Sequence, residues 1–208
     1  MTQRIPALSR DEIGDSLLGL PSFQRGDADQ PFNIYRTLAH HPDLVTHWTR
    51  FADALRFEGT LPDRSRELLI LRTSVNTGCE YEWGQHVPYG VQFGIIDAEL
   101  DALHEQLDAF DWSPADHSLL AAADELHEFS DITDATWDAL NDDLTYKQLI
   151  EVGMIVGQYH LVAYLMNGMR VERDPALVPF RRADGVARDR AARHFQHGPA
   201  APLGRGKD

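Results

Sequence analysis

Four consecutive aliphatic residues, Leu68–Leu71, lie in the middle of Pro62–Asn76, a segment with no helix breaker after its first residue. A surface helix keeps its apolar residues on one stripe, at spacings of three and four. A helix that is apolar at four successive positions must be covered on most of its sides. The sequence therefore predicts a central helix, and the rest of the chain must supply the elements around it.

Other segments have the helical pattern that such a core needs. Pro42–Phe57 places Pro at the first helical position and apolar residues at spacings of three and four. Thr145–Met169 is the longest segment and begins with a capping box formed by Thr145 and Gln148. Period-two alternation is absent, so no strand is predicted and the fold class is all-α, a helical bundle. Further helices are expected at Ser9–Leu17, Asn33–His40, Cys79–Phe93 (kinked or shortened at Pro88), Ala98–Leu107, Ser113–Phe129, Asp131–Leu140 and Val186–Phe195.

The length of 208 residues fits one domain with appendages. We expect an N-terminal arm over residues 1–30, a helical domain over 31–172 and a basic C-terminal extension over 173–208. Residues 181–208 contain seven basic residues and three acidic ones, whereas the whole chain has a formal net charge of −14.

The charge and the cysteine content exclude several classes of function. An acidic chain is a poor ligand for nucleic acid or for an anionic membrane surface, because both require clustered Lys and Arg. A single cysteine, Cys79, rules out an internal disulfide and fits a reducing cytoplasm. The N-terminal residues do not form a secretory signal, and no run of about 18 apolar residues occurs. We therefore expect a cytoplasmic protein whose partner is a small molecule.

The residues that can carry chemistry gather around Cys79. Glu82 and His86 follow it at +3 and +7, a spacing that places all three on one face of a helix. Glu67 lies on the preceding helix and reaches the same place only if the two helices pack side by side. The short break at Gly78 allows that packing.

This cluster could hold and move protons. Cys79 at a helix start should have a lowered pKa, although the nearby acids Glu80 and Glu82 oppose the thiolate. Glu82 and His86 form an i, i+4 pair that can hold a proton at neutral pH. Each residue also has a simpler interpretation, since a lone Cys is usually a small buried hydrophobe and a Glu–His pair is often a surface contact.

The same stretch resembles the core motif of the carboxymuconolactone decarboxylase and alkylhydroperoxidase D-like superfamily. The peroxidase branch has Glu, eleven residues, Cys-x-x-Cys, three residues and His, and this chain has Glu67, Cys79, Glu82 and His86 in that register. The decarboxylase-like branch is also resembled by the sequence segments PDRSRELLILR, YEWGQH and GQYH. The resemblance covers residues 31–172 and implies an all-α bundle of the alkylhydroperoxidase D-like type.

Glu82 stands where the peroxidase branch has its second cysteine. One sulfur cannot cycle to a disulfide, so a thiol relay and peroxidase activity are not expected. The lactone decarboxylases resemble Glu82-Trp83-x-x-His86 more closely. The resemblance therefore implies decarboxylase or lactone chemistry on a small organic acid without a cofactor, with His86 as general acid/base, Glu82 and Glu67 positioning it and Cys79 lining the pocket. It also implies a homo-oligomer, a trimer or a hexamer.

Two alternatives stay open at this point. The expected pocket wall consists of Trp83, Tyr159 and His160. The first alternative is a metal site in an oxygenase or hydrolase, with His86, His127 and His160 as its ligands. The simpler interpretation of His160 is a core histidine bonded to a helix carbonyl. The chain could also be a non-catalytic, oligomeric ligand-binding protein that kept the fold.

Overall fold

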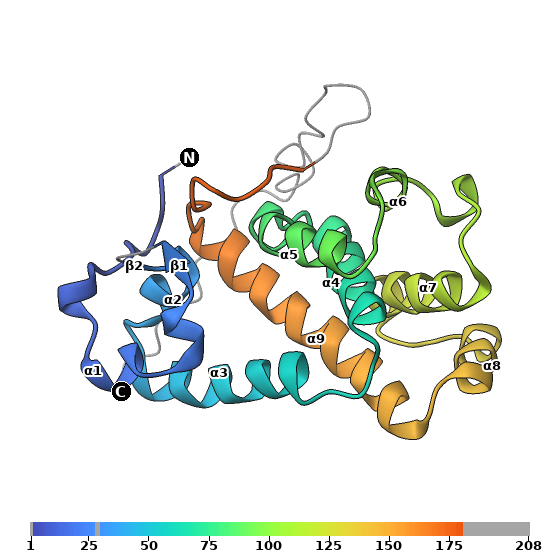
Figure 1. Cartoon of the computed structure of the whole chain (residues 1–208), viewed down its shortest axis with the longest axis horizontal. Coiled ribbons are helices and arrows are strands. Elements are labelled where there is room, and N and C mark those ends of the chain that lie inside the picture. The colour runs from blue at the N-terminus through green and yellow to red at the C-terminus, as the bar shows by residue number, and fades with distance from the viewer. Residues whose placement is uncertain (1, 28–29, 181–208) are drawn as a thin grey trace, which may run out of the picture.

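The computed structural model describes residues 2–27 and 30–180, so the expected helix at 186–195 and most of the basic extension lie outside the described residues. Within the described residues the fold is a helical bundle with one short hairpin (Figure 1). The helices are α1 (Asp15–Leu18), α2 (Asn33–Leu38), α3 (Pro42–Phe57), α4 (Asp63–Thr77), α5 (Glu80–Gln92), α6 (Asp97–Ala102), α7 (Pro114–Phe129), α8 (Asp134–Asp143) and α9 (Tyr146–Met169), with short 3-10 turns η1 (Arg10–Glu12), η2 (Pro21–Gln24) and η3 (Leu107–Ala109).

Helix α4 is the central helix, as predicted. Its residues Leu68–Leu71 are fully buried, and α4 contacts α5, α7 and α9 on different sides. Gly78 ends α4 in the left-handed conformation at φ 64°, which a glycine adopts without steric cost. This turn brings α5 back alongside α4.

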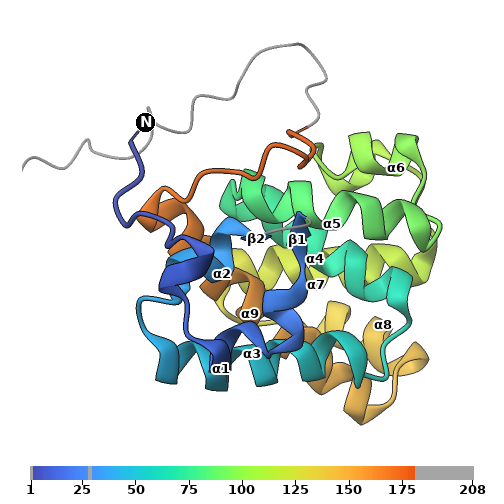
Figure 2. The same ribbon diagram turned by 60° about the vertical axis from the view of Figure 1, so that its left-hand side comes forward.

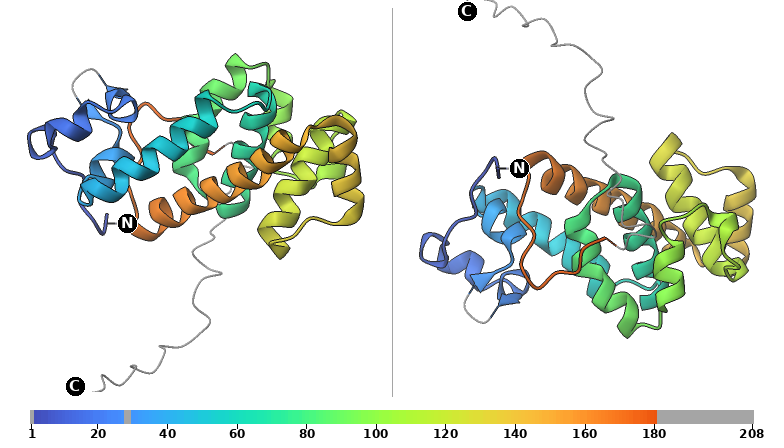
Figure 3. Two further views of the ribbon diagram at one scale, coloured as in Figure 1. Left: turned by 90° about the horizontal axis from the view of Figure 1, so that it is seen from below. Right: turned by 90° about the horizontal axis from the view of Figure 1, so that it is seen from above.

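Helix α9 crosses the whole molecule and links its two ends. The arm and α2 lie at one end of α3 and α9, and α7 and α8 lie at the other (Figure 3). By length and composition α9 could span a membrane, but half of its most apolar window is buried inside the fold. That burial is what a core helix of a bundle requires.

The N-terminal arm differs from the prediction in two ways. Ser9–Leu17 is not one helix, because Ile13 and Gly14 separate η1 from α1. The expectation of no strand is also wrong, since β1 (Gly26–Asp27) pairs antiparallel with β2 (Gln30–Pro31). Two-residue strands are too short to show a period of two, so sequence pattern could not reveal them.

Most other helix boundaries agree with local start and stop signals. Ser113 accepts a hydrogen bond from the backbone N–H of Asp116 at 3.1 Å and caps α7. Helix α5 continues through Pro88 to Gln92 rather than ending there. Helix α6 ends earlier than expected and α8 begins later, behind the N-cap Thr133.

Residues 171–180 form an extended strap over α5 (Figure 2). The indole N–H of Trp83 donates to the carbonyl of Pro179 at 3.1 Å, and the hydroxyl of Tyr81 donates to Asp174 at 2.5 Å. A Cβ on Gly84 would lie 2.7 Å from the carbonyl oxygen of Val178, so the absence of a side chain permits this contact. The strap therefore covers the first turns of α5, around Tyr81, Trp83 and Gly84.

Candidate active site

The acid and imidazole groups predicted to meet do meet, between α4 and α5. Nδ1 of His86 lies 2.7 Å from Oε2 of Glu67, and Nε2 of His86 lies 3.6 Å from Oε2 of Glu82. All three side chains are almost completely buried. The imidazole is thus held between two carboxyl groups, one from each helix.

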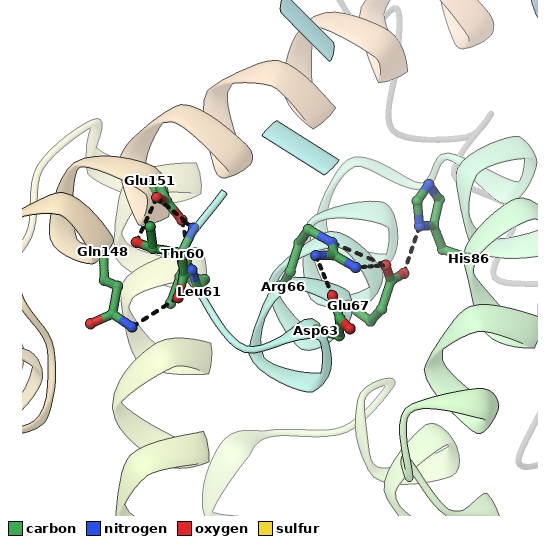
Figure 4. A network of polar contacts seen from close by, with 8 residues as sticks. All are labelled: Thr60, Leu61, Asp63, Arg66, Glu67, His86, Gln148 and Glu151. Carbon is green, nitrogen blue, oxygen red and sulfur yellow. Dashed lines mark hydrogen bonds and ion pairs between the residues drawn. The ribbon is translucent and has the colours of Figure 1, made fainter. Parts of the chain in front are cut away.

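Arg66 contacts the carboxyl group of Glu67 as well. The guanidinium of Arg66 lies 3.4 Å from Oε1 of Glu67 and 2.7 Å from Asp63 (Figure 4). As a carboxylate, Glu67 only accepts hydrogen bonds, so the proton of its bond with His86 sits on Nδ1. Nε2 of His86 is then the ring nitrogen that faces Glu82.

Glu82 has the properties of a proton donor. Its pKa is raised to about 8, mainly by burial, which outweighs the opposing positive charge of Arg25 and is helped by the negative charge of Glu67. A carboxyl with this pKa keeps its proton at pH 7 and can give it up within a catalytic cycle.

Cys79 differs from the expectation of an activated thiol. It is the N-cap of α5, and its side chain is fully buried in an apolar cluster with Tyr81, Val162 and Met166. Burial, followed by the charge of Glu82, raises the pKa of the thiol well above its ordinary range. The predicted lowering is therefore wrong, because desolvation outweighs the favourable position at the helix start.

Glu82 and His86 open onto a small pocket between α2, α3, α5 and α9. Tyr159 lines it as expected, with its ring edge-on to His86 at a centroid distance of 5.0 Å. The space in this pocket is about 40 Å³, which holds roughly three water molecules at 10–15 Å³ each. A larger depression of about 550 Å³ between Asp108 and His117 is open, and its titratable side chains are exposed.

Two predicted wall residues and the alternative metal ligands lie elsewhere. Trp83 packs against His104 and Phe180 beneath the strap rather than on the pocket. His160 bonds the carbonyl of Val156 at 2.8 Å, the simpler arrangement considered above. Its Nε2 lies 2.8 Å from Nδ1 of His127, whereas His86 lies with Glu67 and Glu82. In the described part of the chain no three His, Cys, Asp or Glu side chains are grouped to hold a metal.

The pocket also contains polar residues that sequence reasoning missed. Arg25 comes from the end of η2, Gln85 from α5 and Gln158 from α9. Gln85 could have been found, because it follows Glu82 by three positions and shares its helix face. Gln158 is a polar residue in a helix that is otherwise apolar at its buried positions, and Arg25 has no local signal at all.

The comparisons with known proteins agree with this fold and with the resemblance stated from the motif. Residues 42–125 match the model of the carboxymuconolactone decarboxylase family. No curated protein matches the sequence significantly. An uncharacterized peroxidase-related protein from Ralstonia eutropha JMP134, with an alkylhydroperoxidase AhpD core, superposes with a TM-score of 0.71 at 21% identity over 85% of this chain and 97% of that one.

Two further solved structures have the same fold. An uncharacterized peroxidase-related protein from Silicibacter sp. TM1040 gives a TM-score of 0.71 at 14% identity over 87% of this chain and 99% of its own. The debrominase Bmp8, in complex with 2,3,4-tribromopyrrole, gives 0.70 at 16% identity over 85% and 94% of the two chains. The resemblance stated from the motif is thus confirmed: residues 42–125, which carry Glu67, Cys79, Glu82 and His86, match the carboxymuconolactone decarboxylase family, and the chain has the fold of AhpD-like proteins.

Proposed function

We propose that this protein is a proton-transfer enzyme with decarboxylase or lactone chemistry on a small organic acid. The observation that carries the proposal is the buried line Glu67–His86–Glu82 at the wall of a small pocket. Loss of CO₂ from a carboxylate leaves its electron pair on carbon as a carbanion or enolate, which must then take up a proton. Glu82, protonated at neutral pH, supplies that proton, and His86 returns one to Glu82 from solvent.

The proposal predicts a large loss of turnover when His86 is replaced. We expect His86→Gln to lower turnover by about 10²–10⁴-fold, because a positioned acid/base group contributes that much. The measurement is CO₂ release and deuterium uptake from D₂O, followed by NMR, on β-keto acids and γ-lactone carboxylates that include 4-carboxymuconolactone. His127→Gln is the matched control, since His127 is exposed and lies with His160. Turnover by His86→Gln equal to that of the wild type would contradict the proposal.

One observation favours a second candidate. The pocket of about 40 Å³ is small for a substrate, which is what a ligand-binding protein without chemistry would show. If no compound of the panel turns over while one of them binds, the non-catalytic function is correct. Thiol-dependent peroxide reduction that Cys79→Ser abolishes would instead restore the peroxidase function.

We also propose that the chain forms a homo-oligomer through α9. The solvent side of this helix carries large apolar side chains that are 41–77% exposed, namely Tyr146, Ile150, Met154, Leu161 and Tyr164. Contiguous exposed apolar surface of this kind marks an interaction site. We expect Ile150→Glu combined with Leu161→Glu to convert a trimer or hexamer to monomers in light scattering, and a monomeric wild-type protein would contradict this.

A further inference from the structure

Arg25 reaches the pocket from the N-terminal arm and makes no ion pair with the side chains that the structure describes. Its Nη2 donates to the hydroxyl of Tyr89 at 2.8 Å, and its guanidinium lies 5.7 Å from the centre of the Tyr89 ring. Among the side chains of residues 2–26 and 30–180, no ion pair involves Arg25. Burying a cation in part is costly, and an anion in the pocket would offset that cost.

Three other polar groups face the same pocket without a partner. Nε2 of Gln85, Oε1 of Gln158 and Nε1 of Trp48 are buried and have no hydrogen-bond partner within the described part of the chain. The two glutamines are only 9% and 6% exposed. Buried polar atoms are almost always paired, so three unpaired ones around one pocket indicate that a ligand pairs them.

The charges of the pocket favour an anion, although the chain as a whole is acidic. Arg25 and Arg56 both line it. The acidic residues of the pocket are Asp53 and Glu82. Asp53 accepts a hydrogen bond from Ser22 at 2.8 Å, and the pKa of about 8 keeps Glu82 neutral at pH 7. The wall is therefore net positive.

The shape of the donors identifies the kind of anion. A guanidinium presents parallel N–H groups that match the two oxygens of a carboxylate. Gln85 and Trp48 each offer one more donor, whereas the unpaired oxygen of Gln158 requires a donor on the ligand, such as a hydroxyl. The space of about 40 Å³ admits a planar group with few further atoms.

We propose that Arg25 anchors the carboxylate of a small hydroxy acid in this pocket, with Gln85 and Trp48 donating to the same ligand and Gln158 accepting from its hydroxyl. The proposal deepens the proposed function and rests on the pocket beside Glu82 and His86 being the substrate site. It makes Arg25 a specificity-determining residue and gives the N-terminal arm a direct part in binding.

Calorimetry on the full chain with glycolate and lactate, at fixed ionic strength, tests the anchor. We expect Arg25→Met to weaken binding roughly 10- to 100-fold, the effect of one hydrogen-bonded charge, and Arg25→Lys to recover part of it. Arg50 is the matched control, because it is an exposed arginine on α3, the helix that also carries the pocket residues Trp48 and Arg56. Arg50→Met should bind as the wild type does. Gln158→Leu should weaken glycolate more than acetate, because acetate has no hydroxyl.

The variants separate this proposal from the proton-transfer proposal. His86→Gln should still bind glycolate, so lost turnover with retained binding supports both. If Arg25→Met and Arg50→Met bind equally well, or if no carboxylate binds the wild type more tightly than chloride, the anchor is wrong. Should Arg25→Met be unfolded by circular dichroism, Gln85→Leu replaces it, and unchanged affinity in that variant would likewise overturn the proposal.

Discussion

Replacing Glu82 with Gln is expected to make the protein more stable in alkaline solution and to leave it unchanged in acid. Burial raises the pKa of Glu82 from an ordinary value of 4.5 to about 8. The folded state therefore binds a proton that the unfolded state releases between these values. Stability from this group is fully present below pH 4.5 and is lost as the pH rises through about 8, by roughly 5 kcal/mol at most.

The measurement is the free energy of unfolding in urea at pH 5, 7 and 9. The advantage of Glu82→Gln should grow with pH across this series, because a neutral amide has no charge to desolvate. Glu58→Gln is the matched control, since Glu58 is exposed at the end of α3. If wild type and Glu82→Gln depend on pH identically, Glu82 is not a buried neutral acid.

Removing Glu67 should cost far more than removing the other acid beside Arg66. Glu67 is 1% exposed and contacts both Arg66 and His86, so Glu67→Ala leaves two buried groups without this partner. Loss of one member of a buried ion pair typically costs about 3–5 kcal/mol. Asp63 contacts the same guanidinium but its side chain is 55% exposed, so Asp63→Ala should cost less than about 1 kcal/mol.

Denaturation of both variants at pH 7 tests this difference directly, because each removes one carboxyl group next to the same arginine. Equal and small losses would mean that Glu67 is not held as a buried ion partner. In that case the orientation of His86 would have to come from Glu82 and from packing against Tyr89 and Tyr159.

Local signals predicted much of the fold because they act within a few residues. The capping residues Ser113 and Thr145 and the terminating Gly78 mark true helix ends. The line from Glu67 to His86 was predictable for the same reason, since the tight turn at Gly78 allows the two consecutive helices to lie side by side. The short strands near Gly26 carry no periodic pattern, so their pairing depends on the chain around them.

What sequence could not supply depends on contacts between distant segments. The thiol of Cys79 was expected to be activated, and only the packing of the arm and α9 around it shows the opposite. Trp83 seemed to belong to the pocket because of its neighbour Glu82, yet successive helical residues point in different directions and the strap covers it. Arg25 reaches the site through the fold of the arm, which no spacing rule describes.

The division of the site between chain segments has a consequence for how such proteins diversify. Glu67, Glu82, His86 and the central helix lie inside the family match at residues 42–125, whereas Arg25, Gln158 and Tyr159 of the pocket wall lie outside it. Part of the pocket wall is thus encoded in stretches of sequence separate from the acid–imidazole cluster, although Trp48 and Gln85 lie inside the match. Mutations in the flanking stretches can change the accepted ligand without disturbing the acid–base groups, so relatives can share this helix pair and still act on different molecules.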